Sequence, residues 1–394
     1  MPSAMHRQVL LLATAQALFQ TTGVLVVTIG GLAGSQVGSA ALATAPLASM
    51  FLGNALTTVP ASLWMARVGR RAGFIAGAAL GTTGGLIAAV GVWASSLPLL
   101  CLGTLLLGAY QAFAMFYRFA AAEISDDAFR PRAISFVLTG GIVAAFLGPA
   151  LARWGQPLMT PQYTGSFLLL AGVSLTALLL LLGLRIPTPP QQASQTGARP
   201  LGQIIRQPKY LVALFGAATG QGVMVLAMTA SPLAMVEHHH SVADAAQAIQ
   251  FHVLGMFLPS FFTGALIARF GVLRVMFAGV GLLTGHIVAA LSGTEVPHFF
   301  SALTLLGVGW NFMFIGGTTL VTEAYTPAER GRAQAVNDLI VVGVGLISSL
   351  SSGALLAALG WQTMNTLLLP WLALAAIALM WFGRQRPAAE AAHS

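Results

Sequence analysis

The chain carries one long apolar run after another, and each run can cross a lipid bilayer as a helix. A helix needs about 20 apolar residues to span the hydrocarbon core of a bilayer. No water is present there to bind backbone polar groups, so a spanning run must satisfy them internally as a helix. The sequence therefore predicts an all-α integral membrane protein with twelve transmembrane helices, at roughly 9–34, 40–65, 72–94, 97–121, 133–152, 163–186, 209–235, 243–268, 272–292, 296–321, 333–359 and 362–383.

The composition excludes most other classes of protein. Only 7% of the residues are charged, against about 25% in soluble domains, which is too few to cover a water-exposed surface. The net charge of +8 comes from basic residues that separate the apolar runs and form no patch for nucleic acid. A single cysteine, Cys101, excludes a disulfide framework. The sequence has no nucleotide-binding loop or nucleophile motif, so we expect neither an enzyme nor a bound cofactor.

One polar segment interrupts the apolar pattern. Residues 187–208 are rich in Pro, Gln, Ser and Thr, which predicts a flexible linker. This linker divides the chain into an N-terminal half of six spans, 1–186, and a C-terminal half of six spans, 209–394. Sixteen of the 18 Lys and Arg residues fall on the side of the linker and both termini, and only Arg153 falls on the other side. The positive-inside rule then predicts that the linker and both termini face the cytoplasm.

The two halves repeat each other's loops. The sequence Arg67-Val-Gly69 after the second span is matched by Arg269-Phe-Gly271 after the eighth. Glu123, before the fifth span, is matched by Glu323 before the eleventh, an offset of 200 residues. Matching loops at matching offsets indicate duplication, and a transporter built from two repeats holds its solute at their interface near the bilayer midplane.

These loops resemble the signature of the major facilitator superfamily, which reads G-x-x-x-D-R-x-G-R-R after the second span. Residues 62–71 keep the three arginines and the second glycine, with Ser62 for the first glycine and Ala66 for the aspartate. The resemblance implies a major facilitator fold of two six-helix halves that rock around a central solute site. It also makes Arg67 and Arg269 candidate gate residues, although the acid that usually accompanies each arginine is alanine here.

Arg118 and Asp338 fall inside predicted spans, where a central charge costs about 2.5–3.5 kcal/mol on insertion scales. Arg118 lies near the linker-side end of span four, with Glu123 just beyond it. It is either a snorkelling side chain paired with Glu123 or a gate residue. Asp338 lies about one turn into span eleven, six residues after Arg332. It is either half of a structural ion pair with Arg332 or a proton-coupling acid.

Spans seven and eight carry soft metal donors. Met224 and Met228 lie four residues apart in span seven, and His252 and Met256 lie four apart in span eight. This spacing places each pair on one helix face, and the 1.5 Å rise per residue puts all four at a similar depth. Thioether and imidazole ligands favour Cu(I) over hard cations. The alternative interpretation is packing, because methionine fills apolar cores of any kind.

The turn between these two spans is rich in histidine. Met235 and Glu237 precede the run of His238, His239 and His240. Short histidine tracts bind metals, so the turn is either a metal entry site or a solvated polar turn.

The donor pattern resembles that of the CcoA-like copper importers, a bacterial branch of the major facilitator superfamily. That branch combines M-x-x-x-M in span seven with H-x-x-x-M in span eight, which Met224, Met228, His252 and Met256 match. A further methionine in the branch is Ser260 here. The resemblance implies copper import across the bacterial inner membrane for cytochrome oxidase assembly, with a cytoplasmic copper acceptor as partner. We expect a monomer in the lipid bilayer.

Two other functions remain open at this point. A transporter of a small organic solute or drug would bind its solute with polar and aromatic side chains of the spans, here Gln16, Gln20, Gln111, Trp310 and Asn311. A metal-binding membrane sensor or assembly factor would carry a soluble output domain, and the chain offers only a linker of about 22 residues.

Overall fold

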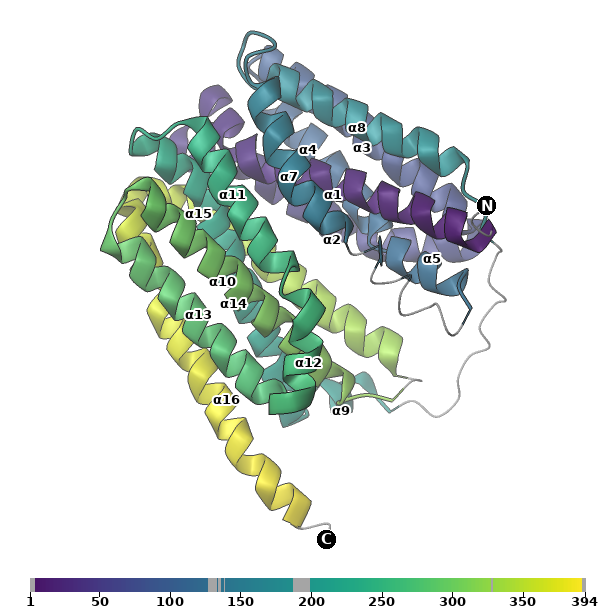
Figure 1. The fold of residues 1–394 in the computed structure, drawn as a ribbon, viewed down its shortest axis with the longest axis vertical. Coiled ribbons are helices and arrows are strands. Elements are labelled where there is room, and N and C mark those ends of the chain that lie inside the picture. The colour runs from purple at the N-terminus through teal and green to yellow at the C-terminus, as the bar shows by residue number, and fades with distance from the viewer. Residues whose placement is uncertain are drawn as a thin grey trace.

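The computed structural model describes residues 4–126, 133, 136–137, 139–186, 199–326 and 329–391, and within them every element is helical. Figure 1 shows two groups of helices. The N-terminal half contains α1 (Ala4–Val37), η1 (Ala40–Leu42), α2 (Ala45–Val68), α3 (Arg70–Trp93), α4 (Leu97–Ala114), α5 (Tyr117–Glu123), α7 (Gly140–Gly155) and α8 (Thr164–Leu182). The C-terminal half contains α9 (Leu201–Ile205), α10 (Pro208–Glu237), α11 (Val242–Phe257), α12 (Ser260–Phe270), α13 (Val272–Ser292), α14 (Val296–Thr322), α15 (Arg330–Thr366) and α16 (Leu368–Ala391).

The helices are consistent with the predicted spans in number and order. In the described part of the chain, nine stretches are long and apolar enough to cross a membrane. The stretch 332–385 has 54 residues and covers two predicted spans, because α15 and α16 follow each other. The bent pair of α11 and α12 forms a further span, with an angle of 42° between its helices. With α7, which occupies the predicted fifth span, these helices account for the twelve predicted spans.

Three predicted spans differ in detail from the structure. The fourth, 97–121, is broken between α4 and α5 at Met115 and Phe116. The eighth, 243–268, is broken at Leu258 and Pro259, where the proline has no backbone N–H to continue the helix. The turn predicted between the last two spans is a kink at Gly360, where φ is 74°, inside a helix that continues to Thr366.

The repeated loops have the same backbone conformation. Gly69 has φ 93° and ψ 156°, and Gly271 has φ 87° and ψ 149°. This region is open to glycine and costs residues with a Cβ. Each glycine ends one helix and begins the next, α2 to α3 and α12 to α13. The duplication expected from the sequence therefore extends to local geometry.

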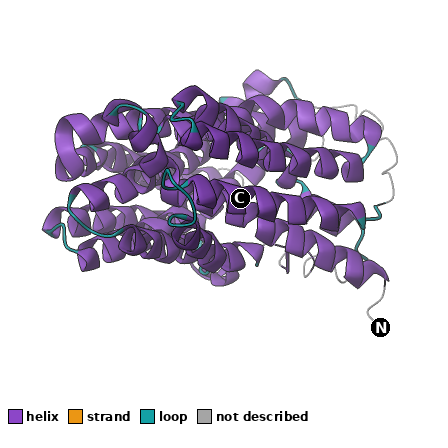
Figure 2. Ribbon diagram, turned by 90° about the horizontal axis from the view of Figure 1, so that it is seen from above, coloured by secondary structure: helices purple, strands orange, loops and turns teal. Residues whose placement is uncertain are grey.

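The halves pack together at one end and diverge at the other. We call the end that holds residues 186 and 199 the linker end, and the opposite end the distal end. At the linker end, the apolar core around Phe74 and Tyr117 contains only residues of the N-terminal half. At the distal end, the core around Leu47 and Phe167 also receives Leu233 and Val242 of the C-terminal half. Figure 1 shows the same arrangement, with the two groups separating toward the N and C labels, and Figure 2 shows the helices running lengthwise.

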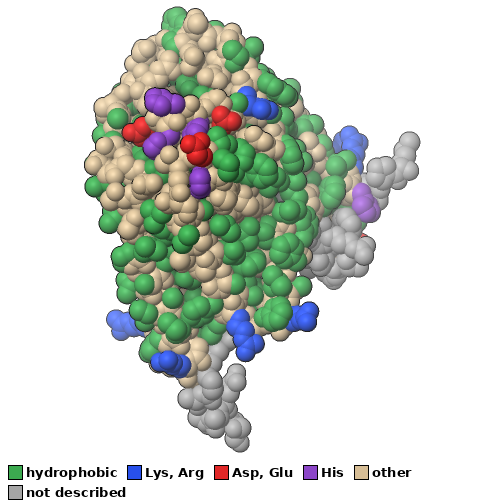
Figure 3. Space-filling model, turned by 60° about the vertical axis from the view of Figure 1, so that its left-hand side comes forward, with side chains coloured by type: hydrophobic (Ala, Val, Ile, Leu, Met, Phe, Trp, Pro, Cys, Tyr) green, Lys and Arg blue, Asp and Glu red, His purple; other side chains and the backbone are tan. Residues whose placement is uncertain are grey.

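Charged side chains gather at the two ends. Figure 3 shows one face on which Lys and Arg lie mainly near one end, acidic and histidine side chains near the other, and hydrophobic side chains between them. Large apolar side chains such as Ile347 and Leu374 are more than half exposed. An apolar surface of this extent suits lipid, which dissolves apolar side chains and excludes charged ones.

Candidate functional site

An aromatic pair on α14 forms one wall of a site in the middle of the C-terminal half. Trp310 and Phe314 are four residues apart, and their rings stack with centroids 4.8 Å apart and planes 14° from parallel. The indole N–H of Trp310 donates to Oε1 of Gln221 on α10, at 3.0 Å. All three side chains are half-buried. The hydrogen bond fixes the indole ring and leaves the amide N–H₂ of Gln221 for other partners.

One helix of the N-terminal half, α2, approaches this wall. Gly345 on α15 has no side chain, and a Cβ there would lie 3.4 Å both from Nε2 of Gln221 and from Cε1 of Phe51 on α2. Phe51 and Gln221, which belong to opposite halves, therefore both lie beside Gly345. A second amide, Gln111 on α4, donates from Nε2 to the sulfur of Met50, at 3.4 Å. Phe51 and Gln111 are also half-buried.

This arrangement suits a flat, polar-edged organic molecule. The Trp310 and Phe314 rings offer a stacking surface, and stacking of a nucleobase on an aromatic side chain contributes about 1–3 kcal/mol. The amide of Gln221 can donate and accept at the edge of such a molecule. Trp310 lies near the middle of α14 and Gln221 near the middle of α10, so the site is close to the depth predicted for a solute.

Asn311 has a different role from the one expected of it. Its Oδ1 accepts from the Thr263 hydroxyl, and its Nδ2 donates to the Met256 carbonyl and the Ser260 hydroxyl, each at 2.7 Å. The side chain is buried, so it stabilises the bend between α11 and α12 and does not face a solute. Gln16 is also buried, whereas Gln20 is half-buried.

The predicted copper ligands lie inside the C-terminal half. Met224 and Met228 belong to its buried core, and Met256 packs against that core. His252 is fully buried, and its Nδ1 lies 3.0 Å from the Leu303 carbonyl. Nδ1 must carry the proton to bond a carbonyl, which leaves the lone pair of Nε2 without a partner in the structure. The structure shows how this nitrogen could act as a ligand, and the four-residue site stays a prediction.

The histidine turn is mostly exposed. His238 and His239 lie on the surface, and Nε2 of His240 is 2.6 Å from the Thr294 carbonyl. Met235 is fully buried in the core, away from this surface. Among the described residues no group of three or more His, Cys, Asp or Glu side chains is placed to hold a metal ion.

The two charges predicted within spans, Arg118 on α5 and Asp338 on α15, belong to opposite halves. Arg118 and Asp338 are both exposed, and each charge acts on the other. The Arg118 guanidinium also lies 4.8 Å from the centre of the Phe119 ring. Glu123, the partner expected for Arg118, instead accepts from Arg70 at 2.8 Å. Asp338 accepts from Asn337 at 3.1 Å, where a pair with Arg332 was one expectation.

The candidate gate residues Arg67 and Arg269 are exposed at matching positions. Both occupy the last turn of a helix, α2 and α12, just before the glycines with positive φ. The Arg269 guanidinium lies 5.2 Å from the centre of the Phe270 ring. Their role in gating stays a prediction.

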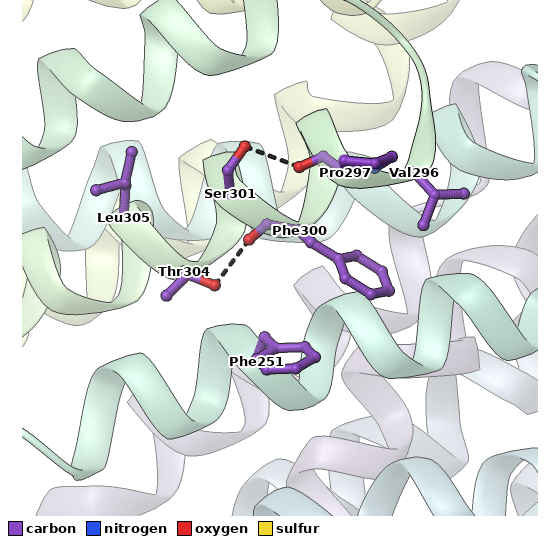
Figure 4. Close-up of a pocket in the computed structure, with 7 residues that line it drawn as sticks. All are labelled: Phe251, Val296, Pro297, Phe300, Ser301, Thr304 and Leu305. Carbon is purple, nitrogen blue, oxygen red and sulfur yellow. Dashed lines mark hydrogen bonds between the residues drawn. The ribbon is translucent and has the colours of Figure 1, made fainter.

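An apolar groove on the outside of the C-terminal half is distinct from the central site. It has a volume of about 660 Å³ and lies between Phe251 on α11 and the first turns of α14, including Phe300 and Leu305. Figure 4 shows the side chains of Ser301 and Thr304 bonded to backbone carbonyls of their own helix. With these hydroxyls occupied, the groove offers little polar recognition.

Known proteins resemble the chain over its whole length. The family model described as Major Facilitator Superfamily matches residues 9–258 and 214–394. The riboflavin transporter RfnT of Brucella anthropi is 43% identical over 383 residues, 96% of each chain. A crystal structure of a bacterial homolog of the human lysosomal transporter Spinster, inward-facing and unoccupied, has a TM-score of 0.75 at 17% identity and 98% coverage of both chains. The nucleoside transporter NupG has a TM-score of 0.74 at 16% identity, covering 94% of this chain and 99% of NupG.

The apolar helices and the similarity to known transporters define a multi-pass membrane transporter. The chain belongs to the major facilitator superfamily, and it is a secondary transporter and not an enzyme. The sequence-based prediction of the superfamily and of its all-α membrane fold is confirmed.

Proposed function

We propose that the protein transports riboflavin, or a flavin of similar shape, across the bacterial plasma membrane. The observation that carries the proposal is the stacked pair of Trp310 and Phe314 beside the Gln221 amide. Riboflavin has a flat three-ring system whose edge carries carbonyl oxygens and ring nitrogens. A stacking surface flanked by amides can bind both parts. The 43% identity to a riboflavin transporter over 96% of the chain supports the same solute.

The proposed cycle is alternating access, with the halves 1–186 and 209–394 rocking about the central site and joined by 187–208. The linker end is the cytoplasmic end in this proposal, supported by the bias of Lys and Arg toward it. The distal end is the one at which the halves pack together. In this state the solute site would communicate with the cytoplasm, the side on which an importer releases its solute.

Arg118 and Asp338 are the proposed coupling pair. Each lies exposed near the linker end of its own half, and each acts on the charge of the other. When the linker end closes, these opposite charges would approach and stabilise closure. Protonation of Asp338 would remove that attraction, which links the position of the halves to proton binding.

Copper import is a second candidate, and one observation favours it. The Nε2 atom of His252 is buried without a partner, and a buried unsatisfied nitrogen costs about 1–3 kcal/mol unless something binds it. Cu(I) held by this nitrogen and the thioethers of Met224, Met228 and Met256 would remove that cost.

Uptake measurements decide between the two solutes. Cells that lack their own riboflavin uptake system, expressing the wild-type protein, should accumulate labelled riboflavin, and the purified protein should quench flavin fluorescence. Copper accumulation measured in parallel should not change. The copper proposal would replace the flavin one if the wild type took up no riboflavin and the Met224→Leu/Met228→Leu variant took up less copper than the wild type. Leucine keeps the volume of methionine and removes the sulfur, so such a loss would point to the thioethers as ligands.

A further inference from the structure

One side chain of the N-terminal half bonds directly to the backbone of a helix in the C-terminal half at the distal end. The hydroxyl of Thr44 donates to the Ser349 carbonyl on α15 at 2.8 Å. The same hydroxyl accepts from the backbone N–H of Gly353, at 3.2 Å. Thr44 is only 1% exposed and Ser349 is fully buried. A bond pair of this kind, in a dry seam between two moving halves, must be made and broken if the halves part there.

The helix α15 is shaped to receive this hydroxyl. Gly345, Ser349 and Gly353 follow one another at spacing four, so they share one face of the helix. This face approaches Phe51 at one position and Thr44 at another, so it is the face that meets α2. A Cβ at residue 353 would lie 2.9 Å from the Thr44 hydroxyl oxygen and 3.1 Å from its methyl carbon. The absence of a side chain at Gly353 is what lets Thr44 reach the backbone.

The groups that Thr44 bonds have a second way to be satisfied. The Ser349 carbonyl and the Gly353 N–H are four residues apart inside a stretch of α15 with helical backbone, the spacing of an α-helical hydrogen bond, so each keeps a partner when Thr44 leaves. Thr44 itself is the residue before the first turn of α2, where threonine usually accepts a backbone N–H with its side chain, yet it makes no such capping bond here. It can do so when released.

We propose that Thr44 is a reversible latch that holds the distal end closed. In the closed state its hydroxyl bridges the halves through the Ser349 carbonyl and the Gly353 N–H. In the open state that carbonyl and N–H keep their helical pairing within α15, and the hydroxyl caps α2. The Thr44 hydroxyl, the Ser349 carbonyl and the Gly353 N–H therefore have partners in both states, so the latch adds stability to closure without adding a large penalty to opening.

The test uses a cysteine in the distal seam and needs no solute, so it is independent of the flavin proposal. Leu233 packs at the distal end beside Gly31 of α1. In a Cys101→Ala background, Leu233→Cys should react with a membrane-impermeant maleimide only when the distal end opens. Thr44→Val removes the hydroxyl and keeps the shape, and Thr44→Ser keeps the hydroxyl. Loss of two hydrogen bonds of ordinary strength predicts labelling roughly fivefold faster or more in Thr44→Val, with Thr44→Ser close to the wild type.

A second variant covers the case in which Thr44→Val does not fold. Gly353→Ala places a methyl group against the Thr44 hydroxyl and leaves every bonding group of Thr44 intact, so it should also accelerate labelling. Yield and monodispersity in detergent show which variants are folded. The latch proposal would be overturned if a folded Thr44→Val or Gly353→Ala variant were labelled at the wild-type rate or more slowly.

Discussion

The distal and linker ends of the molecule hold their helices together by different means. At the distal end, the contacts cross between the halves and are uncharged: apolar packing of Leu233 and Val242 with the N-terminal core, and the hydroxyl of Thr44 on α15. At the linker end, the ion pairs seen among the described residues join partners of one half, or the linker and one half. Arg70 pairs with Glu123 in the N-terminal half, Lys209 pairs with Glu323 in the C-terminal half, and Arg199 of the linker pairs with Glu329.

This difference shows how the two halves can move as units. Ion pairs inside a half keep its loops in place whichever way the half tilts, because their partners move together. Contacts between halves must separate once in every cycle, and weak uncharged contacts separate without leaving a buried charge unpaired. Arg118 and Asp338 are an exception to this pattern. They belong to opposite halves, and each charge acts on the other.

The largest expected effect comes from a test of which end of the molecule faces the cytoplasm, because each cysteine should either react with an external reagent or not react at all. In a Cys101→Ala background, single cysteines at Gln203 on α9 and at Ser241 should behave oppositely toward an impermeant thiol reagent added to intact cells, since both sites are exposed but lie at opposite ends. We expect Ser241→Cys to react and Gln203→Cys to react only after the cells are opened. Reaction of Gln203→Cys in intact cells would reverse the assignment of the ends.

The solute site between the two ends gives the next largest effect. Trp310→Ala removes the stacking surface, so riboflavin uptake should fall about tenfold or more at unchanged expression. Trp371→Ala is the matched control, because Trp371 also holds its indole N–H in a hydrogen bond, to Thr219 at 2.9 Å, but lies on α16 away from Gln221. Equal losses in the two variants would show that Trp310 acts through general packing.

Replacing Asp338 tests the charge pair at the open end. Asp338→Asn keeps the shape and removes the titrating group, so it should reach the membrane normally, transport several-fold more slowly and lose the pH dependence of uptake. Glu123→Gln, which breaks an ion pair inside one half, should leave that pH dependence in place. A pH profile of Asp338→Asn that matches the wild type would assign Asp338 a structural role only.

The smallest effect is expected from the ion pair that joins Arg199 of the linker to Glu329 of the C-terminal half. The Arg199 guanidinium, with help from the Thr326 N–H, holds the pKa of Glu329 well below its usual range. A carboxyl with a lowered pKa adds stability above its unfolded pKa, about 4.3, and loses it as the pH falls. Glu329→Gln should therefore lower the melting temperature in detergent by a few degrees at neutral pH, and the gap to the wild type should narrow in acid. A gap that stays constant with pH would exclude this ion pair as its cause.

The sequence predicted the spans and the repeated loops because apolar length and glycine spacing are local signals. It did not predict the break in the eighth span, although Pro259 marks it, because apolar residues continue on both sides. The partners of Glu123 and Asn311 could not be predicted, since they lie 53 and 48 to 55 residues away along the chain. The placement of both Phe51 and Gln221 beside Gly345 depends on how the two halves dock, which no local pattern records.

Neighbouring positions on α14 differ in their freedom to change. Trp310 lies at the proposed solute site, whereas the next residue, Asn311, bonds three groups around the bend between α11 and α12. We expect a substitution at position 310 to alter what the protein can bind and to leave the scaffold intact. A substitution at position 311 removes partners from Thr263, Ser260 and the Met256 carbonyl together. Among relatives with different solutes, we therefore expect residue 310 to vary with the solute while residue 311 stays the same. Two adjacent residues would then serve different purposes, one the choice of solute and the other the stability of the fold.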